Sequence, residues 1–258
     1  MAAPNGETLL KVEGLCKSFG GVKAVQEFSM ELRREHLVGL IGPNGAGKTT
    51  VFNLLSGIIP SDRGRVLFGG RDVTNQKSFA IARLGIGRTF QNVRLFDGLS
   101  VKDNVKAACF HDATYGPLHA LLGLPSMRRC ERRLDAKVDG LLELVGIRHC
   151  RDERARSLPY GLQRKVEIAR ALATNPQILM LDEPAAGLNP TEVAEMVQLI
   201  RTLQGDHHFS IFLIEHHMEV VMPICHDIYV VNMGQTIAHG TPQEVQAHPE
   251  VIKAYLGE

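Results

Sequence analysis

The chain has 258 residues, of which 44% are hydrophobic and 22% are charged, and its formal net charge is +1. A chain of this length and composition is typical of an ordinary globular protein and can bury a sizeable core. The near-neutral charge argues against nucleic acid as an obligatory partner. No apolar run approaches the ~18 residues that a membrane helix needs, so we expect a protein that is cytosolic or peripheral to a membrane.

Two further features agree with a cytosolic setting. The segment of residues 1–7 is short and polar and has no apolar core of a signal peptide, so we expect a simple N-terminal tail. An odd, unpatterned set of cysteines without a C-x-x-C pair is typical of a reducing compartment and predicts no zinc site. The five cysteines are Cys16, Cys109, Cys130, Cys150 and Cys225.

The first third of the chain is rich in expected strands. Alternating apolar and polar residues predict a strand over residues 9–15, broken at 18–21, and further strands are expected over 22–30 and 65–68. The apolar run 37–41 predicts a buried strand. Residues 51–56 have the pattern of the first turns of a helix, which Gly57 and Pro60 would end.

A glycine-rich loop between that buried strand and that helix fits G-x-x-x-x-G-K-[ST] at every fixed position. Glycines allow consecutive N–H groups to point inward, and a helix N-terminus adds partial positive charge, so the loop predicts a phosphate-binding nest. In this motif Lys48 reaches the β- and γ-phosphates and the Thr49 hydroxyl ligates Mg²⁺. We therefore predict that the chain binds a nucleoside triphosphate. The loop comprises Gly42, Pro43, Asn44, Gly45, Ala46, Gly47, Lys48, Thr49 and Thr50.

Helical patterns dominate the middle of the chain. Apolar residues recur at helical spacing over 102–110, 117–124, 126–145 and 160–173, which predicts a helical insertion or subdomain over about residues 93–170. A basic run within it, Arg128 to Arg133, is either a solvated helix face or a docking surface for a partner or for lipid headgroups.

Strands and helices alternate again after this region. Strands are expected over 177–181, 210–214 and 228–231 and a helix over 191–203, an order typical of a parallel sheet covered on both faces. The first of these strands ends at Asp182 and Glu183, where open α/β sheets bind ligands. Asp182 is a candidate Mg²⁺ ligand. Glu183 is a candidate general base for water, and a purely structural carboxylate is the alternative.

Taken together, these motifs resemble the ATPase subunit of an ABC transporter, and the resemblance spans residues 8–258 as a single domain. It rests on the phosphate loop, on Gln91 after Gly87-Arg88-Thr89-Phe90, on Leu158 to Arg164, on Asp182 to Pro190, and on His216. The segments 182–190, 213–218 and 251–258 are most similar to the branch that serves branched-chain amino acid uptake. The resemblance implies an α/β P-loop NTPase fold: a mostly parallel sheet core, an antiparallel β subdomain and an inserted α-helical subdomain.

The resemblance also implies roles for individual residues. Phe19 stands where the family places an aromatic ring that stacks on adenine, although a plain core Phe is the alternative. The Gln91 amide would reach Mg²⁺ or the attacking water. His216 would hydrogen-bond the γ-phosphate and orient that water. His217 and the pair His207–His208 lack such placement and are expected to be surface histidines.

Two departures from the family concern what this chain gives to a second ATPase subunit. The usual Leu-Ser-Gly-Gly-Gln signature, which caps the nucleotide of the opposite subunit, is here Leu158, Pro159, Tyr160, Gly161 and Leu162. Pro159 has neither a hydroxyl nor an N–H. The usual Asp of the later dimer-contact loop is Asn189. We therefore expect a heterodimer with two unequal sites.

The leading hypothesis is an ATP- and Mg²⁺-dependent motor subunit at the cytoplasmic face of a bacterial inner membrane. Its partners would be a second ATPase subunit, two multi-span permeases and, indirectly, an extracytoplasmic binding protein, with no nucleic acid. The alternative is a soluble ABC-type ATPase switch without a transporter. Such switches usually carry long coiled-coil insertions or two cassettes per chain, for which 258 residues leave no room.

Overall fold

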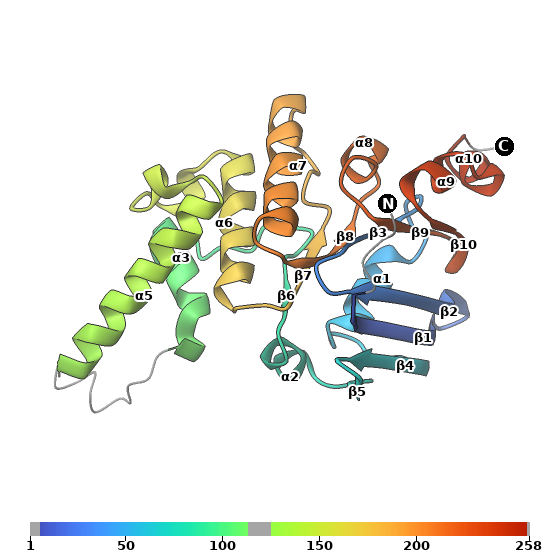
Figure 1. Cartoon of the computed structure of the whole chain (residues 1–258), viewed down its shortest axis with the longest axis horizontal. Helices are drawn as coiled ribbons and strands as arrows, with labels where there is room; N and C mark the ends of the chain where they lie inside the picture. The colour runs from blue at the N-terminus through green and yellow to red at the C-terminus, as the bar shows by residue number, and fades with distance from the viewer. Residues whose placement is uncertain (1–5, 113–124, 257–258) are drawn as a thin grey trace. The chain divides into compact units, whose positions relative to one another are not determined.

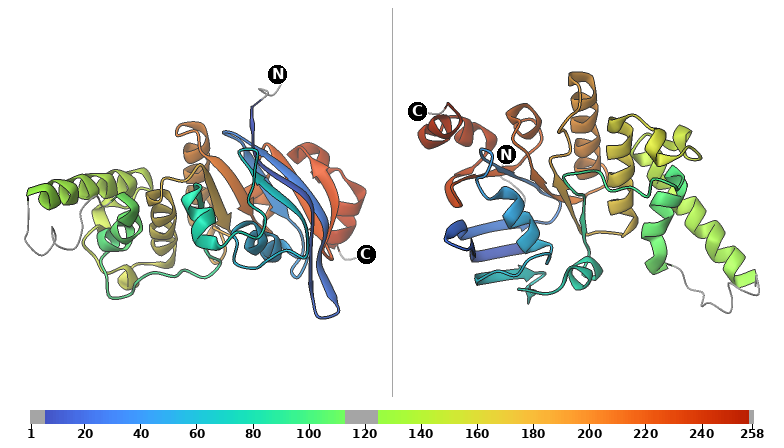
Figure 2. Two further views of the ribbon diagram at one scale, coloured as in Figure 1. Left: turned by 90° about the horizontal axis from the view of Figure 1, so that it is seen from below. Right: turned by 180° about the vertical axis from the view of Figure 1, so that it is seen from behind.

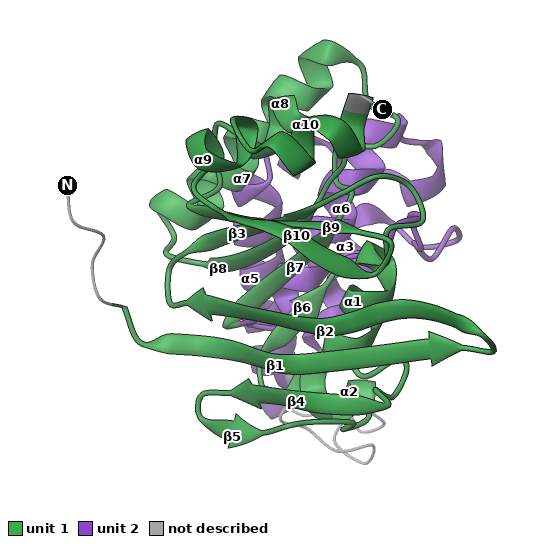
Figure 3. Ribbon diagram, turned by 90° about the vertical axis from the view of Figure 1, so that its right-hand side faces the viewer, with its two compact units in different colours: residues 1–88, 177–258 green, residues 89–176 purple. Residues whose placement is uncertain are grey.

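The computed structural model describes residues 6–112 and 125–256. The chain divides into two compact units, one made by Met1–Arg88 with Gln177–Glu258 and the other by Thr89–Pro176 (Figure 3). The second unit is thus an insertion into the first, and the range 93–170 expected for the helical subdomain lies within it.

A six-stranded sheet forms the centre of the first unit, with the strand order β10-β9-β3-β8-β7-β6 (Figure 1). All neighbouring strands in it are parallel except β10, which is antiparallel to β9. Every residue of β3, β7 and β8 is buried, which explains why these strands have continuous apolar runs. The strands are β3 (Leu37–Ile41), β6 (Ile86–Arg88), β7 (Ile178–Asp182), β8 (Ser210–Ile214), β9 (Asp227–Asn232) and β10 (Gln235–Gly240).

A second sheet of the first unit is antiparallel, with the order β2-β1-β4-β5. Its strands are β1 (Thr8–Phe19), β2 (Val22–Arg33), β4 (Arg63–Phe68) and β5 (Arg71–Asp72). The expected break at residues 18–21 was wrong: β1 continues to Phe19, which pairs with Val22 in a long hairpin (Figure 2). Pairing across the hairpin satisfies the backbone there, so only Gly20 and Gly21 turn.

One hydrophobic core joins the two sheets. Phe28 of β2, Phe52 of α1 and Phe212 of β8 are all buried in it, and the rings of Phe52 and Phe212 lie 5.4 Å apart. The helices of this unit are α1 (Lys48–Leu55), α2 (Ser78–Arg83), α7 (Pro190–Gly205), α8 (Met218–Val221), α9 (Pro242–Gln246) and α10 (Pro249–Leu256). The sequence patterns missed α2, α8, α9, α10, β5, β6 and β10, which are short.

The second unit is helical in its described part. Its longest helix, α5, buries Cys130, Leu134, Val138 and Leu142 along one face and packs against α3 and α6 (Figure 1). The helix expected over 117–124 lies outside the described residues. The elements are α3 (Val101–Ala108), η1 (Cys109–Asp112), α5 (Pro125–Leu144), η2 (Arg148–Cys150), η3 (Ala155–Ser157) and α6 (Tyr160–Ala173). Within the described residues, no helix is both long and apolar enough to cross a membrane.

Candidate functional site

Three neighbouring parallel strands bring the predicted residues of the first unit to one edge of the sheet. Leu40 in β3 and Asp182 in β7 are both in register with Ile214 of β8. The segments that follow these strands therefore lie side by side: the phosphate loop, Glu183, and the pair Glu215–His216. The carboxyl ends of parallel strands are where open α/β sheets bind ligands.

Glycine is required in the phosphate loop by its backbone and by its neighbours. Gly42, Gly45 and Gly47 have φ angles of 155°, 80° and 105°. A Cβ on Gly42 would lie 2.0 Å from the carbonyl oxygen of Val231, and one on Gly47 would lie 2.3 Å from that of Ala24. Gly47 also forms the N-cap of α1, so the loop leads directly into a helix N-terminus.

Lys48 is folded back onto the loop. Its ammonium group donates to the carbonyl oxygens of Gly42 at 2.7 Å and Pro43 at 3.0 Å, and the residue is only 5% exposed. Burial lowers the pKa of Lys48, while the carboxylates of Glu183, Glu215 and Asp182 act in the opposite direction. These carboxylates thus belong to the same electrostatic environment as the loop.

Asp182 ends β7 fully buried and pairs with Arg88, a residue to which the sequence analysis gave no role. Arg88 Nη2 lies 3.1 Å from Asp182 Oδ2, and Arg88 Nη1 donates to Asn53 at 2.8 Å and to Ser56 at 2.6 Å. Arg88 therefore links β6, α1 and the carboxylate of β7. The only feature of the sequence that could have indicated Arg88 is its place three residues before Gln91.

Glu183 and His216 approach each other across the edge of the sheet. Glu183 has a positive φ of 46°, and its N–H donates to the carbonyl oxygen of Ile214 at 2.9 Å. His216 Nδ1 lies 3.7 Å from Glu183 Oε1. A non-glycine residue in the left-handed region is uncommon and is typical of functional turns. The two side chains predicted to act on water are thus neighbours.

Glu215 is a second residue that the sequence analysis left without a role. It is fully buried, and its two carboxylate oxygens accept hydrogen bonds from the N–H of Ala185 at 3.0 Å and of His216 at 3.2 Å. His217 Nδ1 lies 3.4 Å from the same carboxylate, and its ring lies 3.9 Å from that of His216. Glu215 therefore fixes the turn after Glu183 against the segment that carries His216.

Phe19 closes β1 beside the hairpin turn and is 49% exposed. Lys17 Nζ lies 5.6 Å from the centre of its ring. A plain core phenylalanine is therefore excluded, because the ring offers a face to solvent. Thr49 and Thr50 in the first turn of α1 are half-buried.

Gln91 belongs to the second unit, where a buried arginine holds its backbone. Arg164, 2% exposed, donates to the carbonyl oxygens of Phe90 and Gln91 and pairs with Glu167 at 3.1 Å. Glu167 in turn accepts the N–H of Phe90 at 3.0 Å. Burial raises the pKa of Glu167, and these hydrogen bonds act against the shift. The Gln91 side chain itself is exposed.

The unusual signature segment begins α6 in the same unit. Pro159 is the N-cap, without a side-chain cap, and Leu158 and Gly161 are buried. Tyr160 is 41% exposed, and the Arg164 guanidinium lies 5.3 Å from the centre of its ring. The first turn of α6 therefore carries this segment, and Arg164, one turn later, hydrogen-bonds the backbone at Gln91.

Comparison with known proteins decides the family. Residues 25–186, well over half of the chain, match the family model described as ABC transporter. The chain belongs to the ABC transporter ATP-binding cassettes. As a member, this cassette has the P-loop NTPase fold, binds nucleotide and is of the ATPase class. Residues 235–258 of the cassette match a second model, described as branched-chain amino acid ATP-binding cassette transporter.

Full-length relatives agree with this assignment. The cassette is 46% identical, over 98% of its length and 99% of the relative, to the high-affinity branched-chain amino acid transport ATP-binding protein LivG of Salmonella typhimurium. It is 43% identical to the similarly described BraF of Pseudomonas aeruginosa, over 97% of the cassette and 98% of the relative. The crystal structure of the ADP conformation of an ABC transporter cassette is similar with a TM-score of 0.84 and 31% identity, over 98% of this chain and 100% of that one.

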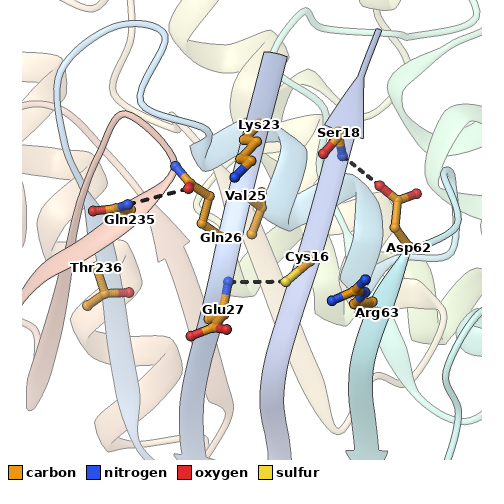
Figure 4. A pocket seen from close by; sticks show the side chains of 10 residues that line it. All are labelled: Cys16, Ser18, Lys23, Val25, Gln26, Glu27, Asp62, Arg63, Gln235 and Thr236. Atoms are coloured by element: carbon orange, nitrogen blue, oxygen red, sulfur yellow. Dashed lines mark hydrogen bonds between the residues drawn. The ribbon is translucent and has the colours of Figure 1, made fainter. Parts of the chain in front are cut away.

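The cassette also has a hollow with a volume of about 740 Å³, whose lining residues do not belong to the phosphate loop (Figure 4). It opens over the antiparallel sheet where a bulge separates β1 from β2: the N–H of Glu27 points to Cys16 Sγ at 3.3 Å, and Glu27 has a φ of 51°. No predicted site residue lines it. Its lining is Cys16, Ser18, Lys23, Val25, Gln26, Glu27, Asp62, Arg63, Gln235 and Thr236.

Proposed function

We propose that this cassette hydrolyses ATP to energise the uptake of branched-chain, or closely related, amino acids through separate membrane subunits. The observation that carries the cargo class is the match of residues 235–258 to the branched-chain family, together with full-length identity to LivG and BraF. The observation that carries the chemistry is the convergence of Lys48, Asp182, Glu183 and His216 at one edge of the sheet.

In the proposed reaction the loop N–H groups and Lys48 bind the phosphates of ATP, and Phe19 stacks on the adenine. Lys48 would exchange the carbonyl oxygens that it now contacts for phosphate oxygens. Glu183 takes a proton from water as that water attacks the γ-phosphorus, and the bond to the β-phosphate oxygen breaks to give ADP and phosphate. His216, held by Glu215, orients the water and the γ-phosphate.

Magnesium fits the donor groups of this edge. Mg²⁺ prefers hard oxygen ligands, and the Thr49 hydroxyl and the Asp182 carboxylate supply them; the Gln91 amide is the third proposed ligand, from the second unit. When bound, the ion neutralises charge on the β- and γ-phosphates. The pairing of Arg88 with Asp182 holds that carboxylate in a fixed position.

We further propose that a second, different cassette completes each nucleotide site. Leu158, Pro159, Tyr160 and Gly161 would face the partner's nucleotide, and Pro159 can donate no hydrogen bond there. The nucleotide site that contains this chain's own phosphate loop would then be the one with the more complete set of hydrogen-bond donors. Two multi-span permeases, and a binding protein outside the membrane, would complete the transporter, with the cassette at the cytoplasmic face and no nucleic acid involved.

The proposal is tested by isolating the tagged cassette from gently solubilised host membranes. We expect two multi-span proteins and a second cassette to accompany it, and the complex to hydrolyse ATP faster when its binding protein carries leucine. A Lys48→Ala cassette should assemble equally but lose ATP binding at its own site. Recovery from the soluble fraction alone, or with nucleic acid, would overturn the transporter and favour the soluble switch.

A further inference from the structure

Four arginines lie on the outer face of α5: Arg128, Arg129, Arg132 and Arg133. All four are exposed, whereas Cys130 and Leu134 between them are buried on the opposite side of the helix. Because residues four apart share a helix face, Arg128 stands beside Arg132 and Arg129 beside Arg133. We call these four residues the α5 arginine patch.

The α5 arginine patch has no counter-charge among the described residues. None of their carboxylates lies within ion-pair distance of these arginines, whereas at least six other cations of the unit each have one within 4.0 Å. Those six are Lys102, Lys106, Lys137, Arg148, Arg151 and Arg164. Positive charge is therefore concentrated on this face, although the chain's net charge is only +1.

The acidic residues of α5 nearest the patch are paired with a lysine of another helix. Glu131 and Asp135 both pair with Lys106 of α3. Within the described part of the chain, two patch residues hydrogen-bond backbone carbonyls and no carboxylate: Arg132 donates to Arg128, and Arg133 donates to Asp112 at 2.8 Å. Such contacts orient a guanidinium without neutralising it, so its charge remains available to an anion.

The chemistry of the patch favours phosphate over a protein surface. None of the large apolar side chains found exposed in the described residues lies on α5. A protein interface usually has an apolar or aromatic core, which this face lacks. Guanidinium groups match phosphate with two parallel hydrogen bonds. Beside the patch, a hollow of about 520 Å³ is lined by Met127, Arg128, Glu131 and Arg132, which a headgroup could enter.

We propose that the α5 arginine patch binds the anionic phospholipid headgroups of the membrane directly. This contact goes beyond the proposed function, since it requires no permease: the cassette itself recognises the surface on which it works. Each basic residue near an anionic surface strengthens binding about fivefold, so four act together as an electrostatic anchor. Nucleotide hydrolysis does not involve the patch.

The test is sedimentation of the purified cassette with vesicles, at 0.1 M salt. We expect binding to vesicles with 30% phosphatidylglycerol and none to pure phosphatidylcholine. The variant R128Q/R129Q/R132Q/R133Q should bind at least about 100-fold more weakly. Raising the salt to 0.5 M should abolish binding, because charges on a surface are screened beyond a few ångströms there.

A matched control removes the same charge elsewhere. R65Q/R71Q/K77Q/R83Q changes four exposed cations of the first unit and should weaken binding by less than about fivefold. The paired variants R128Q/R132Q and R129Q/R133Q should each lose about 25-fold, which keeps the test valid if the fourfold variant fails to fold. Melting temperatures and ATP binding should match the unmodified cassette throughout.

Four results would overturn the proposal. Equal binding to the two vesicle types would mean that binding does not depend on the headgroup charge. Equal losses in the patch variant and the control would mean that total charge, not the patch, is responsible. Displacement from vesicles by 10 mM inorganic phosphate at constant ionic strength would make the patch a small-anion site. A patch variant that keeps vesicle binding but no longer recovers the permeases would assign the patch to a protein partner.

Discussion

Arg88 and Asp182 form a buried ion pair, with Nη2 and Oδ2 3.1 Å apart and side chains that are 9% and 0% exposed. The pair connects β6 to the carboxyl end of β7, and the same guanidinium reaches the helix that follows the phosphate loop. Its planar shape serves three acceptors at once and lies over the Phe52 ring at 4.9 Å. The carboxylate proposed to hold Mg²⁺ is thereby fixed relative to the helix that carries Thr49.

Replacing Arg88 tests this relationship by stability. Arg88→Ala removes the cation from a fully buried carboxylate, so we expect the free energy of unfolding to fall by about 3–5 kcal/mol. Arg88→Lys keeps the charge but loses the planar guanidinium with its several donors, so the free energy of unfolding should fall by about 1–3 kcal/mol. Urea titration of nucleotide-free protein measures both. Arg83→Ala, an exposed control, should stay within about 0.5 kcal/mol, and a similar value for Arg88→Ala would contradict the assigned role.

Glu183→Gln should separate binding from chemistry. The amide keeps the size of the side chain but cannot take a proton from water, so hydrolysis should fall by about 10²- to 10⁴-fold while ATP affinity is retained. Steady-state phosphate release and nucleotide binding measure the two quantities. Glu219→Gln, the same change at an exposed position of α8, should leave both unchanged. Unaltered hydrolysis in Glu183→Gln would remove that residue from its role.

Glu215→Gln addresses positioning rather than proton transfer. Glu215 accepts the N–H groups of Ala185 and His216, and a glutamine can replace only one of the two accepting oxygens. We expect hydrolysis to fall by about tenfold with little change in ATP affinity, because a 1.4 kcal/mol loss of positioning corresponds to that factor. A fall as large as that of Glu183→Gln would instead make Glu215 a candidate base.

His226 makes stability depend on pH at the other end of the sheet. Burial first, and His36 next, lower the pKa of His226, while the charge of Asp227 opposes the shift. Its Nδ1 accepts the Leu37 N–H, a bond that only an unprotonated ring nitrogen can form. The unfolded chain therefore binds the proton before the folded one, and stability is lost as the pH falls below about 6.5. The loss cannot exceed about 1.4 kcal/mol per pH unit for one group.

The control for that prediction is a variant that still accepts the Leu37 N–H but has no group at position 226 that titrates. In His226→Asn the amide oxygen can still accept the Leu37 N–H, so the free energy of unfolding should lose this part of its slope between pH 7 and 5. His207→Asn, at an exposed position, should keep the slope. Parallel pH profiles for the unmodified protein and His226→Asn would show that His226 does not titrate as we expect.

Asn189 has a structural role that its departure from the family pattern conceals. It caps α7 in a reciprocal capping box: its side chain accepts the Glu192 N–H at 3.0 Å, and Glu192 accepts the Asn189 N–H at 3.0 Å. Asn189→Ala should cost about 1 kcal/mol of unfolding free energy, and Asn189→Asp almost nothing. Urea titration checks this, with Thr191→Ala as the neighbouring exposed control. Equal stability of all three variants would show that the cap is dispensable.

Much of the site could be predicted because its chemistry is local in the chain. The phosphate loop needs glycines, a lysine and a hydroxyl within nine consecutive residues, after a strand and before a helix, and the structure has that order. Asp182 and Glu183 could be predicted in the same way, as acidic residues after a buried apolar run. The helix over 160–173 was also predicted correctly, because its apolar spacing extends over several turns.

The sequence by itself thus determined where the phosphate loop and the acidic pair at the end of β7 lie, and it determined the family. Only the tertiary structure decided which buried charges support them. Arg88 and Asp182 are 94 residues apart, and Arg164 and Gln91 are 73 apart, so no local pattern relates them. An arginine can be buried only where partners offset its cost of desolvation, and folding brings these partners from distant parts of the chain. A sequence therefore does not distinguish a buried arginine from one at the surface.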